Sequence, residues 1–139
     1  MRVITIASRR HLAPVRVLAT SLRETNPSVM FSVVLSDLLS DEEILGEDFE
    51  VVDPSALDLT SDDLGRMTLM YDEAEFASVL RPWALRWALR TSDERCAVYL
   101  APDTTVHTTL DDLERTAQRH GVGLCPRRLT PIPGDGLRP

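Results

Sequence analysis

A short apolar stretch that ends in a carboxylate constrains the fold of this chain more than any other feature. Residues Ala97–Leu100 form a run of apolar and aromatic side chains, and Asp103 follows shortly after it. Such a run is typical of a strand buried on both faces, as in a parallel sheet covered by helices. In open α/β sheets, ligands bind beyond the C-terminal ends of the strands. We therefore expect Asp103 to lie at the mouth of a cleft.

The N-terminal half of the chain alternates strand and helix signals. β-branched residues predict a first strand from Arg2 to Ala7. The helix after it is expected to end at Asn26, because the following proline disfavours the α conformation there. Two further strands are predicted at residues 31–36 and 49–52. The buried face of the helix is predicted from apolar residues spaced by three and four, which are Leu12, Val15, Leu18, Ala19 and Leu22.

The second half continues the pattern with longer helical segments. Residues 55–70 predict a short helix or an ordered loop. A helix is then expected to end near Leu80 and a second one to start at Pro82, because proline interrupts the main-chain hydrogen bonding of a helix. The strand at 96–100 is followed by a predicted helix that stops at Gly121, and Val122–Cys125 is predicted as a fifth strand.

This order of elements predicts an α/β fold. We expect a Rossmann-like three-layer sandwich, with a mostly parallel sheet of about five strands and helices on both faces. The sandwich is assigned to residues 1–126. Residues 127–139 are assigned to a C-terminal tail, because prolines and glycines are frequent there.

Composition excludes several classes of function. The net charge of -7 argues against a nucleic-acid partner. No apolar run reaches the roughly 20 residues of a membrane span, so we expect a cytoplasmic protein. All 15 basic residues are arginines. The absence of lysine excludes Schiff-base catalysis and the phosphate-binding P-loop. The polar residues after the first strand also lack the glycine-rich fingerprint of dinucleotide-binding folds.

Four stretches, taken in order, resemble the N-terminal, donor-binding half of bacterial GT-A glycosyltransferases similar to family 8. They are Ile4–Ala7 with the helix after it, Phe31–Asp37, Tyr71–Leu85 with its Leu80-Arg81-Pro82-Trp83 core, and Val98–Asp103. The similarity extends from about Val3 to about Asp135. The resemblance implies a partial GT-A domain that binds a nucleotide-diphospho-sugar, either a UDP-sugar or a GDP-sugar.

The resemblance also implies roles for individual residues. Ala7 and Ser8 would lie at the nucleoside with Asp37 nearby, Arg81 would lie near the diphosphate, and Asp103 would bind a divalent metal, Mn²⁺ or Mg²⁺. The family carries Asp-x-Asp where this chain has Ala101-Pro102-Asp103, so metal affinity is expected to be weakened. Arginine supplies the positive charge in metal-independent relatives of the broader fold, and the pairs Arg9-Arg10 and Arg127-Arg128 are candidates for that role.

Two functional hypotheses remain open at this stage. The first is a glycosyltransferase-like donor module that stops before its acceptor half. In this hypothesis, the missing C-terminal half is supplied elsewhere. The second is a degenerate relative that acts as a binding or interaction module. Either a homodimer formed through the region around Val122–Cys125 or poor solubility caused by that region is also expected. A cleft that brings Ser8, Arg81 and Asp103 together would favour the first hypothesis.

Overall fold

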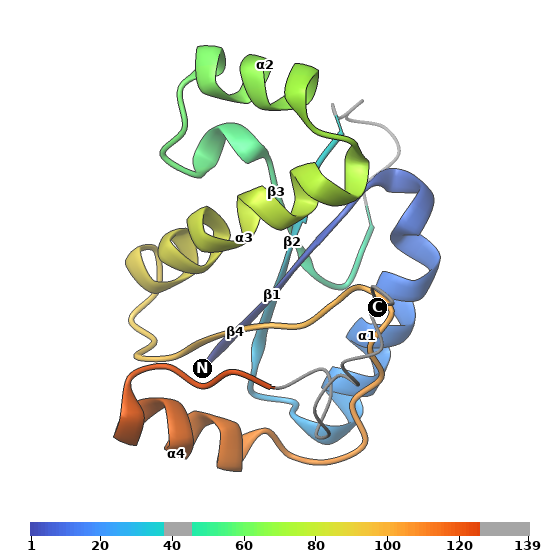
Figure 1. Cartoon of the computed structure of the whole chain (residues 1–139). Helices are drawn as coiled ribbons and strands as arrows, with labels where there is room; N and C mark the ends of the chain where they lie inside the picture. The colour runs from blue at the N-terminus through green and yellow to red at the C-terminus, as the bar shows by residue number, and fades with distance from the viewer. Residues whose placement is uncertain (38–45, 126–139) are drawn as a thin grey trace, which may run out of the picture.

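The computed structural model describes residues 1–37 and 46–125, which form a four-stranded sheet with helices on both faces (Figure 1). The strand order is β3-β2-β1-β4, and all three pairings are parallel. The α/β sandwich predicted from the sequence is confirmed, with four strands instead of about five. The strands are β1 (Arg2–Ala7), β2 (Met30–Leu35), β3 (Glu50–Val52) and β4 (Ala97–Tyr99).

Strand β1 is the centre of the molecule, and all six of its residues are buried. Its side chains alternate between the two faces of the sheet. Ile4 and Ile6 pack in the cluster that contains the buried side chains of α3 (Glu73–Arg90). Val3 packs against buried leucines of α1 (Leu12–Thr25) on the other face. The sheet is therefore the middle layer between α3 and α1 (Figure 1).

Helix α3 runs through Pro82 without interruption, so the predicted break between Leu80 and Pro82 is wrong. Proline removes one main-chain hydrogen bond and disfavours the α conformation of the residue before it. Packing outweighs this cost, because α3 buries one face on both sides of the proline. That face consists of Phe76, Leu80, Ala84 and Ala88.

The remaining elements cover the ends of the sheet. A 3₁₀ turn, η1 (Arg9–His11), follows β1, and a second, η3 (Pro54–Ala56), follows β3. Helix α2 (Ser61–Met70) starts with a capping box between Thr60 and Asp63, in the segment predicted as a short helix or loop. Helix α4 (Asp111–His120) lies at the opposite end of the molecule from α2 (Figure 1).

The predicted fifth strand, Val122–Cys125, has no strand conformation and no sheet partner among the described residues. Gly121 ends α4 with a φ of 81°, and the side chains of Val122 and Leu124 are 76% and 89% exposed. An alternating apolar pattern forms a strand only where a neighbouring strand accepts its hydrogen bonds, and this segment runs through solvent. The predicted tail, 127–139, lies outside the described residues. No helix within 1–37 or 46–125 is long and apolar enough to cross a bilayer.

A buried arginine connects three strands to the end of a helix at the N-terminal edge of the sheet. Arg2 is 2% exposed, and its Nε donates to Ser32 Oγ at 2.9 Å while its Nη2 pairs with Glu50. Its guanidinium lies 4.3 Å from the centre of the Trp87 ring and donates to Thr91 Oγ1 at 3.1 Å. These contacts join β1 to β2, β3 and the end of α3.

The substitution Glu50→Gln is expected to lower the free energy of unfolding by about 2 kcal/mol, because it leaves the Arg2 charge buried without a carboxylate. The figure lies below the roughly 3–5 kcal/mol of a fully buried pair, since the Glu50 side chain is 47% exposed. Urea unfolding measures it. Asp112→Asn is the matched control, because its ion pair with Arg115 is exposed on both sides. Equal stabilities of the two variants would contradict the role of Arg2.

The substitution Pro82→Ala is expected to raise the free energy of unfolding by about 1–2 kcal/mol. Alanine restores the missing main-chain donor within α3, and the gain exceeds the roughly 0.4–1 kcal/mol that the more flexible unfolded chain costs. The urea midpoint should increase while the far-ultraviolet circular dichroism keeps its helical intensity. A decrease in the midpoint would show that the proline is compatible with the helix at no cost.

Candidate functional site

The C-terminal ends of three parallel strands meet at one edge of the sheet. Ala7 at the end of β1 is in register with Leu35 at the end of β2, and the Ser36 N–H donates to the Ala7 carbonyl at 2.9 Å. On the other side of β1, the Leu100 N–H donates to the Ile4 carbonyl at 3.1 Å, which aligns the turn after β4. The polar residues after these strands therefore come from three separate parts of the chain.

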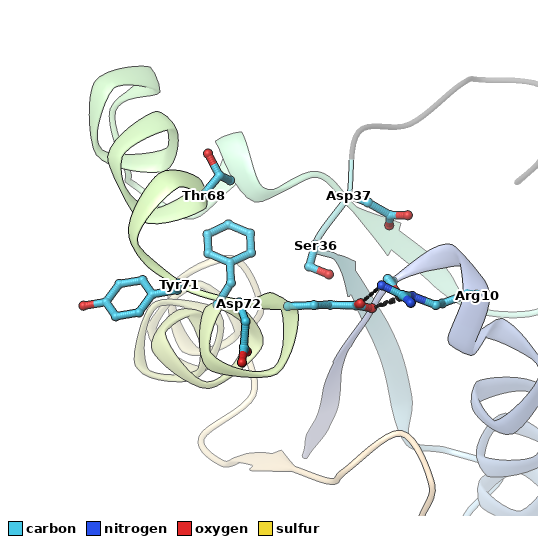
Figure 2. A pocket seen from close by; sticks show the side chains of 9 residues that line it. Arg10, Ser36, Asp37, Thr68, Tyr71 and Asp72 are labelled. Atoms are coloured by element: carbon cyan, nitrogen blue, oxygen red, sulfur yellow. Dashed lines mark hydrogen bonds and ion pairs between the residues drawn. The ribbon is translucent and has the colours of Figure 1, made fainter.

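A cleft of about 460 Å³ opens at this edge, between the strand ends and the first turns of α3. Ala7, Ser8 and Arg81 line it, whereas Asp103, which was expected to share a cleft with Ser8 and Arg81, is not part of the lining. A smaller hollow of about 260 Å³ adjoins it and shares Ser8 and Glu73 with it; Figure 2 shows Asp37 and Ser36 on one side of this hollow and Asp72 on the other. The volume of the larger cleft is within the range of ligand-binding clefts.

Arg81 and Tyr99 both line the larger cleft and contact each other. The Arg81 guanidinium lies 4.9 Å from the centre of the Tyr99 ring, a distance at which a cation is attracted to the ring face. Burial raises the pKa of the Tyr99 phenol, the neighbouring Arg81 charge and hydrogen bond partly offset that rise, and the Asp103 charge adds to it. Arg81 and Asp103 therefore both act electrostatically on one ring.

Glu73, the first residue of α3, organises the other end of the cleft. Its carboxylate accepts hydrogen bonds from Ser8 Oγ and from the Arg10 guanidinium, the latter drawn as dashed lines in Figure 2. His11 Nδ1 lies 3.0 Å from Ser8 Oγ and 3.4 Å from Glu73 Oε1. The charge of Glu73 is thus compensated from the loop after β1.

Asp37 and Arg9 hold each other in place at the ends of β1 and β2. The Arg9 main-chain N–H donates to Asp37 Oδ1 at 3.0 Å, and Arg9 Nε donates to Asp37 Oδ2 at 3.2 Å. Asp37 also lines the smaller hollow, whereas Arg9 lines neither space. The pair fixes the direction in which the loop after β1 leaves the sheet.

The turn after β4 places apolar groups in the cleft where the family pattern has its first carboxylate. Ala101 and Pro102 line the larger space, and Asp103 follows as an exposed residue outside the lining. Mg²⁺ and Mn²⁺ prefer several hard oxygen ligands. Within 1–37 and 46–125, no group of three or more acidic, histidine or cysteine side chains gathers at one point. This donor set does not fit a metal held by the protein itself, and a cation bound to Asp103 stays a prediction.

Sequence reasoning did not identify Glu73, His11 or Tyr99 as members of the cleft. His11 and Glu73 are 62 positions apart in the chain, and only the docking of α3 onto β1 brings them together. Tyr99 lies within an apolar strand and carries no polar signal of its own. The available indication that Tyr99 lines the cleft was its position near the C-terminal end of a predicted buried strand.

Comparison with known proteins connects this architecture to glycosyltransferases. No family model and no curated protein matches the chain. Among solved structures, an active-site mutant of LgtC is similar with a TM-score of 0.52, and the galactosyltransferase LgtC in complex with donor and acceptor sugar analogs is similar with a TM-score of 0.50. In both, 18% of residues are identical, and the match covers 81% of this chain.

The chain therefore has a glycosyltransferase-like fold. It spans 41% of the length of the LgtC structures. An identity of 18% establishes the architecture alone and assigns no residue a role.

The opposite effects of Arg81 and Asp103 on Tyr99 predict two pKa shifts of opposite sign. Asp103→Asn should lower the pKa of Tyr99, because a negative charge is removed, and Arg81→Gln should raise it. Ultraviolet titration of the two tyrosines measures both shifts, and Tyr99→Phe identifies the phenol by removing its transition. Identical titration curves for wild type and both charge variants would contradict the arrangement around the ring.

Proposed function

We propose that the chain binds the nucleotide-diphospho-sugar donor of a glycosyl transfer, a UDP-sugar or a GDP-sugar, in the cleft at the C-terminal edge of its sheet. The observation that carries the proposal is Arg81, whose guanidinium lies over Tyr99 inside that cleft. A guanidinium in a cleft at this edge suits a ligand that carries phosphates. The similarity to LgtC, a galactosyltransferase solved with a donor analog, supports the same ligand class.

The two ends of the cleft differ in chemistry, as the parts of a sugar nucleotide do. At one end, Ser8 and Glu73 offer a hydroxyl and a carboxylate oxygen, groups that hydrogen-bond the hydroxyls of a ribose. At the other end, Arg81 faces the turn after β4. In this arrangement, Ala7 and Ser8 hold the nucleoside, Arg81 contacts the diphosphate, and the Arg9–Asp37 pair positions the loop between them.

Binding of the donor and transfer of its sugar are separate activities. A degenerate relative that binds the donor without transferring its sugar is the second candidate, and the observation that favours it is the Ala101 side chain in the cleft. The two candidates differ in turnover. Release of free sugar from a bound sugar nucleotide, followed by chromatography, supports the enzyme, whereas stable binding of the intact donor supports the binding module.

Filling the cleft is expected to weaken nucleotide binding. Ala74 is exposed and lines the cleft from α3, so Ala74→Trp should weaken binding of UDP or GDP at least tenfold through steric overlap. Ser78→Trp is the matched control, because Ser78 is exposed on the same helix and lines neither space. Calorimetric titration with Mn²⁺ present throughout measures both variants. A wild-type chain that is folded but binds neither nucleotide would refute the proposal.

A further inference from the structure

We propose that this chain holds the diphosphate of its ligand through the Arg81 guanidinium and needs no divalent cation to do so. The inference rests on the proposed donor binding and specifies how the charge of the ligand is compensated. A nucleoside diphosphate carries at least two negative charges at neutral pH, and a cleft that binds it must supply positive charge. The turn after β4 offers the Ala101 methyl group and Pro102 to the cleft.

Among the arginines at this edge, Arg81 is the one whose charge is available to a ligand. Arg10 is paired with Glu73, and Arg9 is bonded to Asp37. Within the described residues, Arg81 forms no ion pair with a carboxylate, and it contacts the ring and the phenol of Tyr99. The ring face orients the guanidinium, and the N–H groups that do not bond the Tyr99 phenol are available to a ligand. The arginine that the cleft presents is therefore already oriented and has no carboxylate bonded to it.

The guanidinium matches the ligand in geometry as well as in charge. Its planar fork donates two parallel hydrogen bonds to adjacent phosphate oxygens, which a lysine ammonium does not reproduce. Arg81 lines the same space as Ser8, so one ligand is able to contact both residues. Asp103 adds negative charge next to the Tyr99–Arg81 pair. In the absence of a metal, this carboxylate opposes the binding of a diphosphate.

The test is calorimetric titration of the full chain with UDP and GDP, once in excess EDTA and once in Mn²⁺. We expect the better ligand to bind with dissociation constants that agree within about twofold in the two conditions. In EDTA, Arg81→Gln should weaken binding at least tenfold and Arg81→Lys should restore part of it. Arg86→Gln is the matched control, since Arg86 lies on the same helix over the Trp83 ring and outside the cleft.

The sign of the Asp103 effect separates the two ways of compensating the charge. Asp103→Asn should leave binding unchanged or strengthen it, whereas a metal-dependent site would lose affinity. Binding that requires Mn²⁺ and disappears in Asp103→Asn overturns this inference and leaves the proposed function standing. Binding in EDTA that Arg81→Gln does not weaken also overturns it. A folded chain that binds neither nucleotide in either condition refutes both proposals.

Discussion

The parallel alignment of β1 with β2 and β4 is the constraint on which the cleft depends. Parallel strands place all their C-terminal ends at one edge, so residues from three distant parts of the chain meet there. Arg2 anchors the N-terminal end of β1 through Ser32, Glu50 and Trp87. At about 3.3 Å per residue, the anchored start of β1 lies roughly 17 Å from its end at Ala7. One strand thus separates the part that stabilises the fold from the part that opens to a ligand.

The features recovered from the sequence are those with local signals. β1 is encoded by a run of β-branched residues and the buried face of α1 by apolar residues spaced by three and four, and both were predicted closely. The features that were missed depend on contacts between distant segments. Helix α3 continues through Pro82 because the sheet buries residues on both sides of it, and Val122–Cys125 is no strand because no neighbour pairs with it. The same reason hid Glu73 and Tyr99, whose partners lie far away in the sequence.

The electrostatics of the cleft follow from pairing within an acidic protein. The chain carries a net charge of -7, which by itself repels an anionic ligand. At physiological salt, however, charges more than about 8 Å apart at the surface are largely screened. The local balance decides, and there Asp37 is bonded to Arg9 while Glu73 is bonded to Arg10. These pairs offset the charges of Asp37 and Glu73. Asp72, the N-cap of α3, also lines the cleft, and Arg81 is the guanidinium among the residues that line it.

Helix α3 contributes side chains to both the core and the cleft. Its buried face, which includes Leu80 and Ala84, stabilises the sheet, Arg81 lines the cleft, and Ala77 packs against the core while it also lines the cleft. Ala101, on the turn after β4, lines the cleft and belongs to none of the core clusters, so the residue type at this position affects the charge of the cleft without altering the packing of α3 on the sheet. A fold shared at 18% identity with a glycosyltransferase is compatible with a different means of charge compensation for this reason. Packing of α3 and α1 on the sheet maintains the architecture, and side chains of α3 and of the turn after β4 set the charge of the cleft.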